Sequence, residues 1–563
     1  MSNSNRIRFI SILVFIFAIV IMAKLYMLQI VDHDIYVDKA DRQYTSPSGK
    51  LFSRGTIYFQ NKDGTLVSGA SLKSGFIVAI NPTELSDAES VYKNLSPIIS
   101  IDHDTFMSKA SKSGDPYEEI AKQVDQDTGQ KVKDLNIKGL NVYKERWRFY
   151  PGGQTAGGVL GLLGYQGDEY AGRYGLEKQY DSILQRPDTA YVNFFAQIFS
   201  NINLGQSSES ATGDIVTTIE PTVQAELENL LASTSQLWSP DYIGGIILNP
   251  KNGEIYAMAL YPSFDPNSPQ SQKSSAIFSN KLVEDSYEMG SIIKPLTVSA
   301  GIDAGVITAT STYYDNGFVI VNGKKISNFD SKQRGVVTIQ EALSQSLNVG
   351  MSHIVSLLGN QKFTDYMYDF GVSEKTGIDL PNESRNLTDT LKSNRDIEHF
   401  TASFGQGISL SPINTARVLS SIANGGMLIY PHVVSKINYR IGTSKTVELP
   451  PSRRVMKQST AEEVSRMMVW SVDNVLANGK DKLDHYSVAA KTGTAQVVEN
   501  GAYSSDKFLH SFVGFFPAYD SKFFIFLYMM NPKGAQFSSE TLTTPFSRMV
   551  NFLVNYYELP PDR

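Results

Sequence analysis

The sequence has no cysteine among its 563 residues and only seven histidines. Without thiols the chain forms no disulfide, thiolate zinc site or iron–sulfur cluster, and it has no cysteine nucleophile. The two closest histidines, His485 and His510, are 25 positions apart, so no single helix carries the paired histidines of a metal site. We therefore expect neither a metal nor a cofactor.

The sequence also has no excess of positively charged residues. Lysine and arginine together number 51 and aspartate and glutamate 57, which gives a net charge of −6. Because binding to phosphates needs clustered cations, we expect no nucleic-acid partner. Hydrophobic residues make up 41% of the chain, which excludes a largely disordered protein. At ~100–200 residues per domain, the length predicts about three to four domains.

Long apolar runs are scarce, and only one reaches the length of a membrane span. Residues 9–23 carry no charge, and residues 25–31 continue the run with Gln29 as the one polar residue. Lys24 interrupts the run near one end, where a lysine stem can extend to the lipid headgroups. About 20 apolar residues match the thickness of the hydrocarbon core, so we predict a transmembrane anchor at residues 9–31. A cleaved signal peptide is the alternative, but no small-x-small site stands near Ala23.

The charges that flank this run orient the chain. Arg6 and Arg8 precede it, whereas Asp32, Asp34 and Asp38 follow it. The positive-inside rule then assigns residues 1–8 to the cytoplasm and the chain after residue 31 to the outside. We expect a single-pass protein of the cell membrane with an extracytoplasmic bulk.

A small, polar stretch without apolar periodicity predicts a linker at residues 201–213. It separates an N-terminal region, residues 32–200, from a C-terminal region, residues 214–563. In the second region, residues 244–259 form two apolar runs around an Asn-Pro-Lys-Asn-Gly turn, which predicts a hairpin. Helices are expected at 290–304, 338–358 and 460–476, and strands at 487–490, 512–516 and 523–529. Helices combined with hairpin strands predict a mixed α/β (α+β) fold with a central antiparallel sheet.

In the absence of cysteine, a serine activated by a lysine is the remaining strong nucleophile. The pattern Ser-x-x-Lys places both side chains on one helix face, but it is common by chance. It occurs here at Ser90, Ser291 and Ser504. Two companion patterns also recur: Ser-x-Asn at Ser346 and Ser384, and Lys-[Ser/Thr]-Gly at Lys73, Lys112, Lys375 and Lys491.

Local context selects one match of each pattern. Pro295 is tolerated only in a first helical turn, so we expect the Ser291 hydroxyl at a helix N-terminus, where free N–H groups favour negative charge. Ser346 lies between two helical patterns. Lys491 stands in a strand-like segment, where Gly493 would let a substrate backbone come close. Taken singly, the two serines could be helix caps and Lys294 and Lys491 ordinary solvated lysines. Three motifs in order favour a catalytic site.

The ordered set Ser291-x-x-Lys294, Ser346-x-Asn348 and Lys491-Thr492-Gly493-Thr494 resembles the penicillin-recognising serine transferases, and specifically the class B penicillin-binding proteins of bacteria. Further stretches are similar to that family and extend the resemblance over nearly the whole chain. They are residues 54–55, 148–152, 174–180, 249–255, 261–267, 376–381 and 403–407. The resemblance implies an elongated, non-catalytic N-terminal pedestal, of dimerisation type, and a C-terminal transpeptidase domain.

The resemblance also implies a reaction and a role for each site residue. Ser291 would attack the penultimate D-Ala of a peptidoglycan stem ending in D-Ala-D-Ala, with Lys294 as its base, and an amine on a neighbouring stem would then take the acyl group. Ser346 would relay a proton to the leaving amine, and Asn348 would hold the substrate amide. Lys491, Thr492 and Thr494 would bind the terminal carboxylate, and Gly493 is a further substrate-binding residue. The backbone N–H groups of Ser291 and Thr494 would form the oxyanion hole.

The partners implied by the resemblance are stem peptides, β-lactams, a polytopic glycan-polymerising membrane protein and other division proteins. Several alternatives remain. A β-lactamase shares the triad but has no use for an anchored pedestal, and a β-lactam receptor needs a cytoplasmic effector. A non-catalytic scaffold of a wall-synthesis complex is the alternative outside enzymes. Within the class, the short C-terminus after Pro560 favours a division role over an elongation role.

Overall fold

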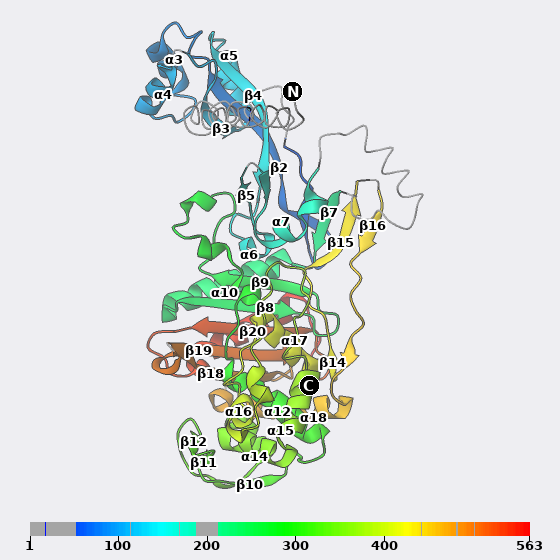
Figure 1. Cartoon of the computed structure of the whole chain (residues 1–563). Helices are drawn as coiled ribbons and strands as arrows, with labels where there is room; N and C mark the ends of the chain where they lie inside the picture. Colours follow the sequence, from blue (N-terminus) through cyan, green and yellow to red (C-terminus); the bar gives the residue numbers. More distant parts are fainter. Residues whose placement is uncertain are drawn as a thin grey trace, which may run out of the picture. The chain divides into compact units, whose positions relative to one another are not determined.

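The computed structural model describes residues 17, 52–112, 114–167, 169–186, 212–440, 442–479, 482–499 and 501–563. The described residues form two compact units (Figure 1). The smaller unit contains residues 72–147, and the larger unit contains residues 54–71, 148–186 and the chain from residue 212 onward. Two segments from the predicted pedestal region are therefore grouped with the C-terminal region by their contacts.

In the smaller unit three helices pack on three strands. The strands are the part of β2 (Leu66–Ile80) after Ser71, β3 (Glu118–Val124) and most of β4 (Leu140–Phe149); the helices are α3 (Ala88–Leu95), α4 (His103–Ala110) and α5 (Gln126–Asp134). Each helix begins after an aspartate whose carboxylate accepts a backbone N–H of the first turn: Asp87, Asp102 and Asp125. Val78, Ile80, Leu95, Phe106 and Val132 form the buried core.

The larger unit begins with a sheet that joins distant parts of the sequence. β1 (Ile57–Gln60) pairs with the first part of β2 and, in parallel, with β7 (Gly213–Thr217); β7 pairs with β15 (Val434–Tyr439), which pairs with β16 (Ser444–Thr446). Beside them lie β5 (Leu163–Gln166), β6 (Glu169–Gly172), α6 (Gly157–Leu160), α7 (Gly175–Gln179) and α8 (Asp181–Leu184).

A buried charged group holds these segments together. The Glu177 carboxylate accepts N–H bonds from Arg54 and from Arg148, each at 2.6 Å, and none of it is exposed to solvent. Arg148 also donates to the carbonyl of Gly55, and Arg54 to Asp181. Both arginines belong to the family-like stretches at residues 54–55 and 148–152. Their charges are compensated inside the larger unit.

The centre of the larger unit is a five-stranded antiparallel sheet in the order β18-β19-β20-β8-β9 (Figure 1). The strands are β18 (Ala489–Glu499), β19 (Ala502–Phe516), β20 (Phe523–Met530), β8 (Tyr242–Leu248) and β9 (Ile255–Tyr261). Every residue of β20 is buried, because helices cover both faces of this central strand. The predicted hairpin at residues 244–259 is confirmed as β8 and β9.

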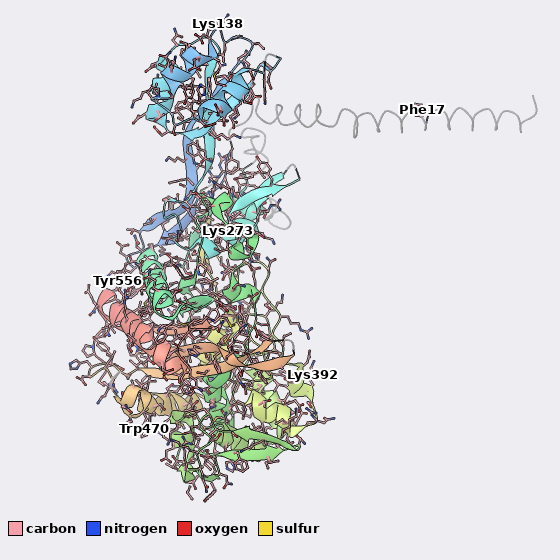
Figure 2. All side chains as sticks on the ribbon, turned by 90° about the vertical axis from the view of Figure 1, so that its left-hand side faces the viewer. Phe17, Lys138, Lys273, Lys392, Trp470 and Tyr556 are labelled. Carbon is pink, nitrogen blue, oxygen red and sulfur yellow. The ribbon has the colours of Figure 1, made fainter. Side chains whose placement is uncertain are left out.

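Alternate residues along the strands face two different helical layers. On one face, side chains such as Ile525 and Leu527 pack against α10 (Pro221–Trp238) and α20 (Thr543–Tyr556). Figure 2 shows these two helices near Tyr556, and α18 (Gln458–Asn474) near Trp470. On the opposite face, Phe524 and Phe526 contribute to the core that contains α12 (Lys294–Asp303) and α17 (Pro412–Ala423).

The remaining described elements form the helical part of the unit and a small lobe of two hairpins. The lobe pairs β10 (Thr312–Asp315) with β13 (Gly335–Thr338), and β11 (Phe318–Val321) with β12 (Lys324–Ser327). The other elements are η3 (Pro269–Ser271), η4 (Ser275–Phe278), α11 (Lys281–Glu284), η5 (Gly290–Ile293), α13 (Ile339–Ser344), α14 (Asn348–Leu358), α15 (Asn360–Asp369), η6 (Asp389–Lys392), α16 (Asp396–Ala402), β14 (Met427–Leu428), β17 (Arg453–Arg454), η7 (Leu476–Gly479) and α19 (Ser538–Thr541).

The mixed α/β fold with an antiparallel sheet is thus confirmed. The predicted cytoplasmic tail, most of the anchor at residues 9–31 and most of the linker at residues 201–213 lie outside the described residues. In the part of the chain that the structure describes, no helix combines the length and apolar character that a membrane span requires.

Candidate active site

A cavity of about 660 Å³ in the larger unit gathers most of the predicted site residues. Ser291, Ser346, Asn348, Lys491, Thr492 and Thr494 all line it. These side chains come from η5, from the turn between α13 and α14, and from β18, which is the edge strand of the five-stranded sheet. Lys294 is buried next to the cavity, with none of its surface exposed.

Ser291 lies in a 3₁₀ turn rather than in the first turn of an α-helix. Residues 290–293 form η5, and α12 begins at Lys294. The sequence predicted that an α-helix would begin around Ser291, and the difference has a chemical cause. Pro295 has no N–H to donate to the Ser291 carbonyl, so the Lys294 N–H binds that carbonyl instead, in the 3₁₀ pattern. Within the described chain the Ser291 hydroxyl makes no hydrogen bond, so it is free to act on a ligand.

Among the described residues, the Lys294 amine forms its hydrogen bonds with Ser346. Its Nζ donates to the Ser346 carbonyl at 2.6 Å and to the Ser346 hydroxyl at 3.1 Å. Burial lowers the pKa of Lys294 well below its usual value, and the charge of Lys491 lowers it further. In its neutral form this amine has two hydrogens and one lone pair. With both hydrogens directed to Ser346, that form would leave the lone pair to accept a proton.

Ser346 stands in a strained turn that brings its hydroxyl to both lysines. Its φ of 59° lies in the left-handed region, which non-glycine residues seldom adopt. Leu347 N–H donates to the Ala342 carbonyl at 2.8 Å and helps to fix the turn between α13 and α14. The hydroxyl oxygen accepts from Lys294 and, at 3.0 Å, from Lys491. Its own hydrogen therefore remains available to donate into the cavity.

Lys491 differs from Lys294 in its second partner and in its access to the cavity. It donates to the Thr492 carbonyl at 2.9 Å, within its own strand, and it lines the cavity. Burial lowers the pKa of Lys491 to about 7. Arg334 is the second cation among the described lining residues, which include no carboxylate. The cavity is therefore suited to an anionic group.

Two glycines allow β18 to lie against the turn that carries Ser291. A Cβ on Gly493 would collide with the Ser511 hydroxyl and would approach the Met289 carbonyl to 2.8 Å. Gly290 has a φ of 64°, and a Cβ there would lie 2.7 Å from the Thr494 carbonyl. From the sequence, Gly493 was predicted to let a substrate backbone come close. The structure fills that space with the chain itself, and Gly493 does not line the cavity.

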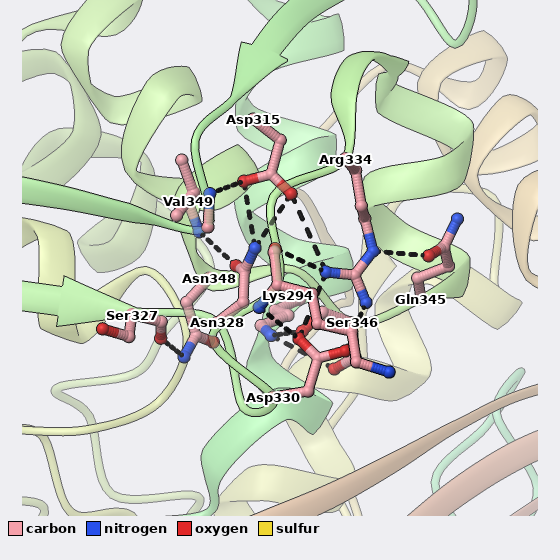
Figure 3. Close-up of polar contacts among 12 residues, drawn as sticks. Lys294, Asp315, Ser327, Asn328, Asp330, Arg334, Gln345, Ser346, Asn348 and Val349 are labelled. Atoms are coloured by element: carbon pink, nitrogen blue, oxygen red, sulfur yellow. Dashed lines mark hydrogen bonds and ion pairs between the residues drawn. The ribbon is translucent and has the colours of Figure 1, made fainter.

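Asn348 and its neighbour are held by a polar network from the two-hairpin lobe (Figure 3). Asn348 donates to the Ser327 carbonyl at 2.9 Å, and the Val349 N–H donates to the Asn328 side-chain oxygen at 3.1 Å. The Asn328 amide in turn donates to both oxygens of the fully buried Asp315, at 3.0 and 2.9 Å. The network ties the first turn of α14 to the lobe.

Arg334 connects the same lobe to the residue before Ser346. Its Nε donates to the Gln345 side-chain oxygen at 2.8 Å, and its guanidinium pairs with Asp330 at 2.9 Å (Figure 3). The sequence alone did not indicate Asp315, Asn328, Arg334 or Gln345, because none belongs to a motif with known chemistry. Only the position of Gln345 beside the Ser-x-Asn motif could have suggested it.

None of the unselected motif matches is among the described residues that line the cavity, and several are engaged in local contacts. Ser90 is on α3 of the smaller unit. Ser504 donates to Asp506, and Lys507 pairs with Glu499 on the exposed end of the β18–β19 hairpin. Lys375 donates to the Glu383 carbonyl, and Ser384 to the Arg385 carbonyl. The context that singled out Ser291, Ser346 and Lys491 therefore chose the three matches that the fold brings together.

Comparisons with known proteins agree with this geometry. Residues 243–550 match the model of the penicillin binding protein transpeptidase domain, and residues 52–191 match the model of the penicillin-binding protein dimerisation domain.

Individual relatives cover most of the chain. Stage V sporulation protein D of Bacillus subtilis is 29% identical over 87% of this chain and 76% of its own length. The probable peptidoglycan D,D-transpeptidase PenA of Neisseria gonorrhoeae is 25% identical over 100% of this chain and 94% of its own. Among solved structures, penicillin binding protein 3 of Mycobacterium tuberculosis, complexed with aztreonam, has a TM-score of 0.70 at 20% identity, covering 91% of this chain and 98% of that one. At this level of sequence identity, the similarity to the solved structure supports the fold alone.

Proposed function

The chain belongs to the class B penicillin-binding proteins, which makes it a serine-type D-Ala-D-Ala transpeptidase, and we propose that it works through an acyl-enzyme on Ser291. The observation that carries this proposal is the pair of hydrogen bonds that Lys294 and Lys491 donate to the Ser346 hydroxyl beside Ser291. The donor substrate is a peptidoglycan stem ending in D-Ala-D-Ala, and β-lactams are mimics that acylate the same serine.

In the first step the Ser291 oxygen bonds to the penultimate D-Ala carbonyl carbon. The proton of Ser291 passes to the free lone pair of Lys294, whose pKa is lowered by burial and by Lys491. The backbone N–H groups of Ser291 and Thr494 stabilise the oxyanion. In other enzymes the loss of one such donor costs about 2.7–4 kcal/mol.

Collapse of this intermediate breaks the amide C–N bond. The Ser346 hydroxyl, whose oxygen already accepts two lysine N–H groups, donates its hydrogen to the leaving nitrogen and is reprotonated from Lys294. The terminal D-Ala leaves as a free amine. An amine of a neighbouring stem then attacks the ester, its proton returns to Ser291 through Lys294, and a new amide cross-links the two stems.

The charges of the cavity orient the donor. Lys491 in its cationic form, with the Thr492 and Thr494 hydroxyls, binds the terminal carboxylate, and the Asn348 side chain binds the stem amide. The Asp315–Asn328 pair and Arg334 hold the turn that presents Ser346 and Asn348. Preorganised groups of this kind lower the barrier because they need no rearrangement during the reaction.

Labelling with a fluorescent penicillin tests the proposal. The wild-type protein should gain one adduct, peptide mapping should locate it on Ser291, and Ser291→Ala should remain unlabelled. Ser90→Ala and Ser504→Ala are matched controls and should label normally. An adduct on either of those serines would overturn the assignment, and an unlabelled wild type would support the non-catalytic scaffold.

We further propose that residues 9–31 anchor the protein in the membrane with the transpeptidase unit outside, next to a glycan-polymerising membrane partner. A fragment that starts at Asp32 should be soluble and should still react with penicillin, whereas the full chain should sediment with membranes. A full chain that stays soluble would contradict the anchor.

We propose a role in cell division, and the elongation type is the alternative. Depletion of a division enzyme should give cells that grow without dividing, whereas depletion of an elongation enzyme should give rounded cells. Microscopy after depletion distinguishes the two roles.

A further inference from the structure

His510 is a fully buried histidine that the reaction described above does not use. It lies on β19 directly opposite Thr494 of β18. Residues opposite each other in an antiparallel pair carry their side chains on the same face of the sheet. The neighbouring residue, Ser511, faces the other way and donates to the Met289 carbonyl at 2.8 Å. The side chains of His510 and Thr494 therefore face away from η5.

The contacts of His510 tie it to α19. Its Nδ1 lies 2.9 Å from the Thr541 hydroxyl oxygen, which is also 3.3 Å from the Ser538 carbonyl. The tautomer of the ring decides whether His510 or Thr541 donates in this contact. Burial lowers the pKa of His510 to about 4, so the neutral form is present at neutral pH.

The helix that His510 holds also contacts Thr494. Thr541 ends α19, and Ser538 begins it. The Ser538 N–H donates to the Thr494 hydroxyl oxygen at 3.1 Å, and the Ser538 hydroxyl donates to the Ser511 carbonyl at 2.7 Å. α19 is thus fastened to the sheet at both ends, once by His510 and once by Ser538.

This arrangement determines how the Thr494 hydroxyl is used. Because its oxygen accepts the Ser538 N–H, its own hydrogen is left to be donated, and both Thr494 and Ser538 line the cavity. A hydroxyl whose hydrogen already points toward the ligand can donate to a carboxylate without reorienting. A freely rotating hydroxyl must lose its rotational freedom when it binds, which weakens the interaction.

We propose that His510 is a positioning residue, which acts through Thr541 and α19 to hold the Thr494 hydroxyl as a donor to the carboxylate of the substrate. The proposal rests on the function proposed above, since it assigns the substrate carboxylate to Thr494. It adds a specificity determinant: the His510–Thr541 contact favours acyl donors with a free carboxylate over neutral ones.

The test compares two probes, benzylpenicillin with its free carboxylate and the methyl ester of benzylpenicillin. The variants are His510→Leu, which removes the contact with Thr541, and His510→Asn, whose side-chain amide can donate or accept in place of Nδ1. Thr541→Val and Thr541→Ser form a second pair, in case His510→Leu does not fold. Thr364→Val is the control, because it removes a buried hydroxyl that donates to the Leu391 carbonyl on another helix.

We expect His510→Leu and Thr541→Val to slow acylation by benzylpenicillin about 3- to 30-fold, the range of a weakened hydrogen bond to a charged group. Acylation by the ester should be unchanged, and His510→Asn and Thr541→Ser should restore most of the rate. In a Thr494→Val background the Thr541→Val substitution should have no further effect, because both act on one hydroxyl.

Equal slowing with both probes would mean general structural damage and would overturn the inference. Full additivity of Thr541→Val with Thr494→Val, or an unchanged preference for the carboxylate, would also overturn it. A wild-type protein that no penicillin acylates would instead contradict the proposed function, so the two failures are distinguishable.

Discussion

Lys294 and Lys491 donate hydrogen bonds to the same atom, the hydroxyl oxygen of Ser346, at 3.1 and 3.0 Å. They differ in their second contact, which is the Ser346 carbonyl for Lys294 and the Thr492 carbonyl for Lys491. Only Lys491 lines the cavity. This difference separates a lysine suited to accept a proton from one suited to bind a carboxylate, and it makes their substitutions distinguishable.

Replacement of Lys294 by arginine should abolish acylation while the fold remains nearly intact. Arginine stays protonated, so unlike the neutral form of Lys294 it has no lone pair with which to accept the Ser291 proton. Loss of a general base typically slows a reaction ~10²–10⁴-fold. Stopped-flow acylation with a chromogenic β-lactam measures the rate, and circular dichroism checks the fold. Acylation of a folded Lys294→Arg variant near the wild-type rate would falsify the role of Lys294 as the base.

The acylation rate constant at low β-lactam concentration should have a bell-shaped pH profile. As the pH falls, Lys294 gains a proton and loses its basic lone pair. As the pH rises through the Lys491 pKa of about 7, the cation that binds the carboxylate is lost. Lys294 and Lys491 donate to the same hydroxyl and influence each other's titration. The apparent pKa values of the two limbs therefore describe the pair of lysines and not either lysine alone.

Lys491→Arg should keep part of the activity and remove the falling limb of this profile, because arginine stays charged above pH 12. The rising limb, which reports Lys294, should remain. Acylation rate constants measured from about pH 5 to about pH 9 check this result. If Lys491→Arg kept the falling limb, that limb would belong to another group.

Gly493→Ala should impair both stability and acylation. The added methyl group collides with Ser511 and lies near the Met289 carbonyl, so β18 or the turn carrying Ser291 must shift. Overpacking of this kind typically costs ~1–3 kcal/mol of unfolding free energy, and a displaced nucleophile loses about 10²-fold in rate. Gly158→Ala is the control, since a Cβ there meets nothing within 4 Å. Equal behaviour of the two variants in urea unfolding and acylation would contradict this account.

Glu177→Gln should be among the most destabilising of single polar substitutions in the larger unit. It leaves Arg54 and Arg148 buried without the carboxylate that both contact at 2.6 Å, and such a loss costs about 3–5 kcal/mol. Glu463→Gln breaks the exposed pair with Arg466 and should cost no more than ~1 kcal/mol. Urea unfolding measures both. The fraction of Glu177→Gln protein that remains folded should be acylated at the wild-type rate, because the described hydrogen-bond partners of the Glu177 side chain do not line the cavity.

The sequence by itself determined the elements and the choice of motifs. Asn249 to Gly253 between two apolar runs predicted the β8–β9 hairpin, and the apolar run from Phe523 predicted a strand that proved to be buried on both faces. Pro295 marked the start of α12. These features depend on turn chemistry and on the period of hydrophobic residues, which act over a few positions and can be read from local sequence.

Tertiary structure alone decided how the selected residues meet. The sequence did not show that Lys294 donates to both oxygens of Ser346, that Asn328 and Asp315 hold the first turn of α14, or that His510 lies opposite Thr494. It also assigned Gly493 to substrate access, whereas contact with Ser511 and Met289 requires this glycine. These contacts join residues that are far apart in the chain, and no local propensity or periodicity specifies which distant side chains become partners. They arise only when the sheet and its helices pack.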